Sequence, residues 1–135
     1  MITVDLATRL RAAGLKWSPS AGDRFVVADR GMDADVFVLS DMTIEVHELP
    51  EGRMIGFNGT TEWALDSVEH EQALWLPRES QLRELLAGTF RTLESVADGW
   101  RVRIDVNGTG HETEHPDPEQ AYGLALLYLL ERARD

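Results

Sequence analysis

The most specific chemical motif in the chain is residues 111–115, which read His-Glu-Thr-Glu-His and match the pattern His-Glu-x-x-His. In a helix this spacing places two imidazoles on one face, one turn apart, where they bind zinc while the glutamate activates a water molecule. The pattern makes His111 and His115 candidate metal ligands and raises the hypothesis of a metal-dependent enzyme. The sequence selects no third ligand, since Glu119 and Glu131 are both available.

The neighbouring residues favour a strand over a helix at this motif. An Asn-Gly turn and a further glycine precede it, and Pro116 and Pro118 follow it. In a strand, His111, Thr113 and His115 share one face and the two glutamates share the other. We therefore expect a solvated edge strand, with a metal-binding protein as the alternative.

Other catalytic patterns are missing from the sequence. The chain has no cysteine, which excludes thiolate metal sites, disulfides and cysteine nucleophiles. It also lacks the G-x-S-x-G, G-x-x-x-x-G-K-[ST] and G-x-G-x-x-G motifs of hydrolases and nucleotide-binding proteins. We assign no catalytic residue and no cofactor, and we expect a protein that is not an enzyme.

The charge balance is strongly acidic. Among 135 residues, 13 are Lys or Arg and 24 are Asp or Glu, which gives a formal net charge of -11. Residues 62–71 and 105–119 contain no Lys or Arg. This balance disfavours nucleic acid and favours a basic protein partner, as in an immunity-type or DNA-mimic protein.

Residues 121–130 form the longest apolar run, half of the roughly 20 residues needed to span a bilayer. The first residues contain no apolar run long enough for a secretion signal. We therefore expect a cytoplasmic protein without a membrane partner.

The same run predicts a helix that is apolar on every side and must be covered all round. One interpretation is a central helix held by the sheet and the other helices. The other is that part of it covers a partner or a second copy in a homodimer. Gly123 inside it indicates the close approach of another segment.

Five aromatic residues are candidates for contacting a partner, since aromatic side chains combine large apolar area with a polar group. They are Trp63, Trp75, Trp100, Tyr122 and Tyr128.

Apolar spacing and turn residues predict the elements. A helix over residues 4–13 begins at the N-cap Thr3. Strands follow at residues 25–27, 36–39, 43–48, 53–57 and 60–65, the last two joined by Asn58-Gly59. Pro77 introduces a short helix with Leu82, Leu85 and Leu86 on one stripe. Three strands, at 90–96, 100–106 and 111–114, precede a final helix that Asp117, Pro118 and Gln120 begin as a capping box.

The resulting order is one helix, five strands, one helix, three strands and one helix. It predicts an α+β fold in which helices pack on one face of a mostly antiparallel sheet. No linker or repeat interrupts the chain, so we expect a single domain over residues 1–135.

Several segments resemble a small bacterial family of unknown function. They are residues 17–25, 58–66, 75–82 and 119–126, which read WSPSAGDRF, NGTTEWALD, WLPRESQL and EQAYGLAL. Members of that family often carry the label "pilus assembly protein CpaE", and the layout is also similar to short phage-type hypothetical proteins. Neither group brings known catalytic residues, so the resemblance bears on the fold alone.

The sequence therefore favours a non-enzymatic protein-binding or accessory domain, which could be homodimeric. A metal-dependent enzyme or metal-binding protein using His111 and His115 is the alternative.

Overall fold

The computed structural model describes residues 1–27, 32–39, 45–49, 52–56, 67–69 and 73–133. Contacts between residues divide the chain into two compact units. Residues 1–16 and 77–135 form the first, here called the terminal unit, and residues 17–76 form the second, here called the inserted unit. The single domain expected from the sequence stays a prediction, and each unit is described by itself.

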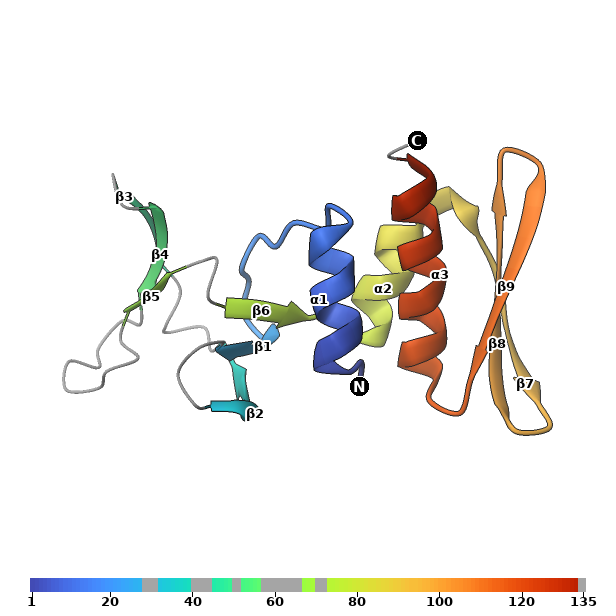
Figure 1. Ribbon diagram of the computed structural model, residues 1–135, viewed down its shortest axis with the longest axis horizontal. Coiled ribbons are helices and arrows are strands. Elements are labelled where there is room, and N and C mark those ends of the chain that lie inside the picture. Colours follow the sequence, from blue (N-terminus) through green and yellow to red (C-terminus); the bar gives the residue numbers. More distant parts are fainter. Residues whose placement is uncertain (28–31, 40–44, 50–51, 57–66, 70–72, 134–135) are drawn as a thin grey trace. The chain divides into compact units, whose positions relative to one another are not determined.

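The helices and strands come in the predicted blocks, except that six described strands, and not five, lie between the first two helices (Figure 1). They are α1 (Val4–Ala12), β1 (Arg24–Val27), β2 (Met32–Val38), β3 (Glu45–Leu49), β4 (Gly52–Gly56), β5 (Ser67–Glu69), β6 (Ala73–Leu76), α2 (Glu79–Leu86), the short 3-10 helix η2 (Ala87–Thr89), β7 (Phe90–Val96), β8 (Gly99–Val106), β9 (Thr109–His115) and α3 (Pro118–Ala133). The described strands form three sheets, ordered β2-β1-β6, β3-β4-β5 and β7-β8-β9. Every ladder between them is antiparallel, which confirms the α+β class.

Two strands were not predicted. β5 lies in an acidic stretch without alternation, and it pairs with β4. β6 pairs with β1, and three of its four residues are buried. A strand covered on both faces reads as a continuous apolar run, so the alternation that marks a half-exposed strand is missing. The hairpin predicted around Asn58-Gly59, with its strand at 60–65, lies outside the described residues.

The terminal unit begins with α1, whose start is fixed as predicted. The Thr3 side chain accepts a hydrogen bond from the Leu6 backbone N–H at 3.1 Å. Leu6 and Leu10 are buried one turn apart on the same face. The chain leaves the helix through Gly14, which has a φ of +113°, a conformation that favours glycine.

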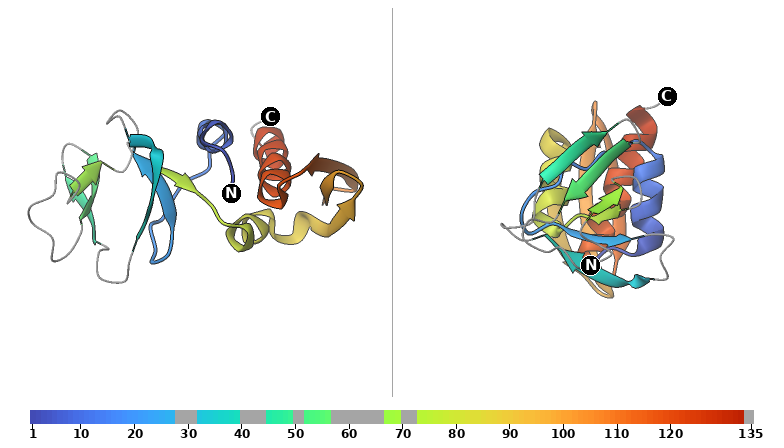
Figure 2. Two further views of the ribbon diagram at one scale, coloured as in Figure 1. Left: turned by 90° about the horizontal axis from the view of Figure 1, so that it is seen from below. Right: turned by 90° about the vertical axis from the view of Figure 1, so that its left-hand side faces the viewer.

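The centre of the terminal unit is α3. It packs against β8 and β9 on one side and against α1 and α2 elsewhere (Figure 2, left). Val102 and Ile104 of β8 are buried, while Arg101 and Arg103 alternate with them along the strand and form ion pairs with glutamates. Helix α3 therefore covers one face of this sheet, and it is the central helix of the unit, since α1 and α2 pack against it.

The start of α3 differs from a capping box. Asp117 accepts a hydrogen bond from the Glu119 N–H at 2.9 Å, as an N-cap should. Gln120, however, does not bind the Asp117 N–H, because its Oε1 accepts instead from the Thr3 N–H at 2.8 Å. The Asp117 N–H donates to Nδ1 of His115 at 2.9 Å. Gln120 thus links the N-terminus of α3 to that of α1. His115 accepts the hydrogen bond from the Asp117 N–H that Gln120 would accept in a capping box.

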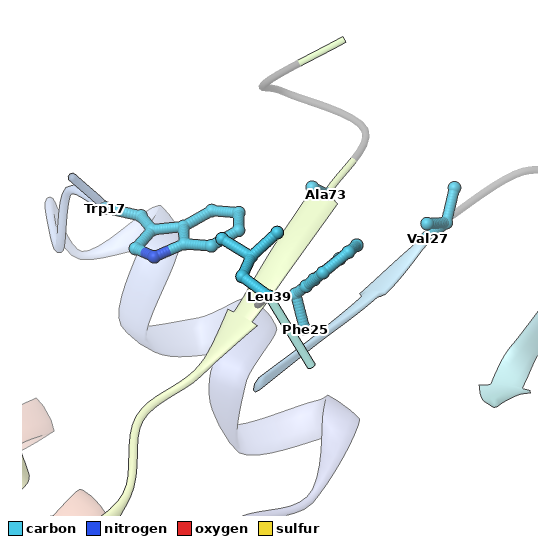
Figure 3. Packing of buried hydrophobic residues seen from close by; sticks show 5 residues of the cluster. All are labelled: Trp17, Phe25, Val27, Leu39 and Ala73. Carbon is cyan, nitrogen blue, oxygen red and sulfur yellow. The ribbon is translucent and has the colours of Figure 1, made fainter. Parts of the chain in front are cut away.

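The inserted unit has an aromatic core on the β2-β1-β6 sheet. Its buried members are Trp17, Phe25, Val27, Leu39 and Ala73 (Figure 3). Phe37 and Trp75 pack against this cluster. The Trp17 ring lies 5.6 Å from the Phe25 ring and 6.5 Å from the Trp75 ring, measured between centroids. Such spacings are favourable for aromatic pairs.

Asp23 ties the segment before β1 to this core. Its side chain is only 1% exposed, and its Oδ2 accepts hydrogen bonds from Trp17 Nε1 at 2.8 Å and from the Ser20 N–H at 3.0 Å. Its backbone carbonyl accepts from the Leu39 N–H at 3.0 Å. A buried carboxylate is tolerated because these donors replace the water it has lost. Asp23 therefore has a structural role.

The contact between α1 and α3 can be tested at Gly123. A Cβ at this position would lie 2.6 Å from Leu6 Cδ2, and Leu6 is itself buried. We expect Gly123→Val to lower the free energy of unfolding of the terminal unit by about 1–3 kcal/mol, because the larger side chain overpacks this contact. Urea denaturation followed by circular dichroism measures the change. Gly110→Val is the control, since no atom lies within 4 Å of a Cβ there, and equal effects of the two changes would contradict the close packing.

The role of Asp23 can be tested by Asp23→Ala. The substitution leaves two donors without their acceptor, and each such donor costs about 1–3 kcal/mol when buried. Hydrogen exchange by mass spectrometry should show faster exchange within residues 17–76 and little change in the terminal unit. Glu84→Ala, at an exposed position of α2, is the control. Unchanged exchange in the inserted unit would show that Asp23 does not hold its core.

Candidate functional site

The His-Glu-x-x-His segment lies on strand β9. His111, Thr113 and His115 share the face that packs on α3, as shown by the Thr113 hydroxyl, which donates to the Ala121 carbonyl at 2.6 Å. Glu112 and Glu114 lie on the opposite face, so the predicted strand is confirmed. Four residues of strand separate the two histidines by about 13 Å. They cannot bind one metal ion together in the manner of the helical motif.

The two glutamates belong to a ladder of ion pairs on the outer face of the sheet. Arg101 Nε lies 2.8 Å from a Glu114 oxygen and 3.2 Å from a Glu112 oxygen. Arg103 contacts Glu94 at 2.6 Å and Glu112 at 3.4 Å. Such exposed pairs contribute little individually to stability. They place arginine beside both carboxylates, which is unfavourable for a general base or a metal ligand.

His115 and Trp100 come together at one end of this sheet. They are directly opposed on β9 and β8. Because His115 Nδ1 accepts a hydrogen bond from the Asp117 N–H, its neutral ring carries the proton on Nε2. The two residues line a shallow cavity of about 330 Å³. Its other lining residues are Val96, Ala97, Asp98, Gly99, Arg101, Glu114 and Pro116.

His111 lies in a different environment, stacked on Tyr128 of α3. The ring centroids are 3.6 Å apart and the planes differ by 3°. The Arg132 guanidinium lies 5.4 Å from the centre of the Tyr128 ring. Burial lowers the pKa of His111, the positive charge of Arg132 lowers it further, and Glu112 partly opposes both. His111 is therefore held as the neutral imidazole at neutral pH.

The structure also shows where the candidate metal ligands lie relative to one another. Within the described part of the chain, no three side chains of His, Cys, Asp or Glu gather closely enough to hold a metal ion. Of the candidates for a third ligand, Glu119 lies near the start of α3, where it accepts a hydrogen bond from the Glu79 N–H at 3.2 Å. Glu131 is exposed near the end of α3.

The five candidate aromatic residues do not form one surface. Trp63 lies outside the described residues. Trp75 belongs to the inserted unit, where it is half-buried on Trp17 and its buried Nε1 has no hydrogen-bond partner among the described residues. Trp100 is half-buried beside His115, and Tyr128 is half-buried against His111.

Tyr122 is a core residue of the terminal unit. Its side chain is 0% exposed, its ring stacks on Phe90 at 5.7 Å, and its hydroxyl accepts from Arg83 Nη2 at 2.8 Å. The Arg83 guanidinium also lies 4.9 Å from the centre of the Phe90 ring. Tyr122 therefore stabilises the helix packing and offers no surface to a partner, which corrects the sequence-based assignment.

Charge is distributed unequally between the two units. The inserted unit has three basic residues, Arg24, Arg30 and Arg53, and twelve acidic ones, which gives -9. The terminal unit has ten basic and twelve acidic residues, which gives -2. Dividing the sequence at its midpoint gives -5 for residues 1–67 and -6 for residues 68–135. Division at the midpoint hides the difference in charge between the two units, because the terminal unit is built from both ends of the sequence.

Exposed apolar side chains add a second feature to the inserted unit. Val36 is 39% exposed and Val38 is 63% exposed, both on β2. Met1 and Val4 are the other large hydrophobic residues exposed within the described residues, and they belong to the terminal unit. Sequence patterning assigned residues 36–39 to a strand, but which of its faces is exposed depends on its neighbours in the sheet.

Comparisons with protein-family models, curated proteins and solved structures find no match for the chain. The resemblance to the bacterial family labelled as pilus assembly proteins therefore stays a prediction. No helix among the described residues has the length and apolar character needed to cross a membrane.

The environment of His111 predicts a pH dependence. Its lowered pKa means that the unfolded chain takes up a proton at a higher pH than the folded chain. The free energy of unfolding should therefore fall as the pH is lowered through the ordinary histidine pKa, until the folded form also binds the proton. His111→Phe keeps an aromatic ring against Tyr128 and removes this titration, so its stability should depend less on pH between 8 and 5. Urea denaturation of both proteins checks this, and identical pH profiles would contradict it.

Proposed function

We propose that this chain is a non-enzymatic binding or accessory domain whose inserted unit binds a basic segment of a protein partner. The observation that carries the proposal is the concentration of charge, -9 of the total -11, in residues 17–76. A region with one sign of charge attracts a partner of opposite sign, accelerates its association and rejects partners of like sign.

The contacts within the terminal unit support placing the partner-binding function in the inserted unit. The terminal unit's glutamates on β9 are paired with Arg101 and Arg103. Its predicted ligands, His111 and His115, lie on one strand and have separate neighbours. On its apolar helix α3, six of the seven residues from Ala121 to Leu127 are buried within the unit. We therefore place the partner-binding function in the inserted unit, and the cytoplasmic location inferred from the sequence is part of the same proposal.

The experiment compares the loss of three carboxylates from each unit. The first variant combines Asp29→Asn, Asp33→Asn and Asp35→Asn in the inserted unit. The matched control combines Glu84→Gln, Asp98→Asn and Glu131→Gln in the terminal unit, at exposed positions. Both variants have the same net charge, so they differ only in where the charge was removed.

Binding of a lysine-rich synthetic peptide is measured by isothermal titration calorimetry at several NaCl concentrations. We expect the affinity of the unmodified protein to fall with rising salt. The inserted-unit variant should bind about tenfold more weakly, since the loss of three ion pairs with the peptide costs about 1–2 kcal/mol in total. The control should change much less. Equal losses in the two variants, or binding that salt does not weaken, would refute the proposal.

A further inference from the structure

Strand β2 lies at the end of its sheet, so one side of its backbone has no strand beside it among the described residues. On its other side, Phe37 pairs with Phe25 and Val38 pairs with Arg24 of β1. A strand in this position presents backbone N–H and C=O groups that another extended segment can pair with.

The side chains of this strand are suited to an additional strand. Val36 and Val38 alternate with Phe37, whose ring stacks on Phe25 at 5.6 Å in the core of the unit. The two valines therefore lie on the opposite face, where they are exposed. β-branched residues favour extended pairing. Natural edge strands are commonly protected by proline or by charged side chains, lysine above all. Residues 32–38 contain no proline or lysine, and their only charged residues are Asp33 and Asp35.

The charge of the strand selects among the segments that could pair with it. Residues 32–38 include Asp33 and Asp35 and no basic residue. A second copy of β2 would bring like charges together across the new ladder, which is destabilising. A segment bearing Lys or Arg would instead be attracted, both by these residues and by the charge of the whole unit.

We propose that the edge of β2 at residues 36–38 binds an extended basic segment of the partner by strand addition. This inference rests on the proposed function and adds the place and the mode of binding. Main-chain hydrogen bonds supply the affinity, apolar side chains of the segment cover Val36 and Val38, and its basic side chains supply the selectivity.

The test uses two synthetic peptides with the same charge. One is acetyl-Lys-Val-Lys-Val-Lys-Val-Lys-amide, and the other has the same sequence with N-methyl groups on alternate backbone nitrogens. N-methylation removes the donors needed for a ladder and keeps every lysine. We expect the methylated peptide to bind at least about tenfold more weakly, which corresponds to a difference of about 1.4 kcal/mol. Hydrogen exchange at the amides of residues 36–38 should slow on binding of the unmodified peptide.

A protein variant tests the same edge without changing the peptide. Val38→Lys places a positive charge on the exposed side of β2 and should weaken binding of the unmodified peptide about tenfold. Val4→Lys adds the same charge at an exposed valine of the terminal unit and should have a much smaller effect. Because both valines are exposed, neither change should unfold the protein, which circular dichroism verifies.

The outcomes separate this inference from the proposed function. Equal binding of the two peptides would overturn strand addition and leave charge-based binding in place. Binding of neither peptide would overturn both. A change from dimer to monomer caused by Val38→Lys, measured by light scattering, would identify a second copy as the occupant of the edge and would also overturn the inference.

Discussion

The need to bury the apolar residues of α3 determines the architecture of the terminal unit. Six of the seven residues from Ala121 to Leu127 are buried, and Leu124 is half-buried. The sheet β7-β8-β9 covers one side, while α1 and α2 pack against the helix elsewhere. Gly123 admits Leu6 of α1, and Gln120 binds the Thr3 N–H, so α1 belongs to the same core as α3. In the sequence, residues 17–76 separate these two parts of one unit and form a compact unit of their own.

Local chemistry in the sequence was enough to predict the helices and the last three strands. Thr3 and Asp117 cap their helices as expected, and alternation along residues 111–115 placed the histidines on one face of a strand. Local patterns could not predict β6, because a fully buried strand does not alternate. They also could not show that His115 would accept the Asp117 N–H in place of Gln120, since that choice depends on Thr3, far away in the sequence.

The candidate site was harder to predict because it depends on which residues fold together. The aromatic residues selected by type include Tyr122, whose hydroxyl and ring are used inside the core. Two features do point to function, namely the net charge and the exposed apolar residues. They can be assigned to one part of the molecule only when the two units are known. Residues 17–76 combine a charge of -9 with exposed valines on an edge strand. The proposed function depends on the presence of both the charge and the exposed strand edge in one unit.

The most direct test of this account is zero-length crosslinking of the protein with a carbodiimide in extracts of its own cells, followed by mass spectrometry. The reagent joins a carboxylate to an amine only where the two are in contact. We expect crosslinks from aspartates and glutamates of residues 17–76 to lysines of a basic protein, and we expect these crosslinks to disappear at high salt. Crosslinks confined to carboxylates of the terminal unit, or crosslinks to a partner that persist at high salt, would contradict it.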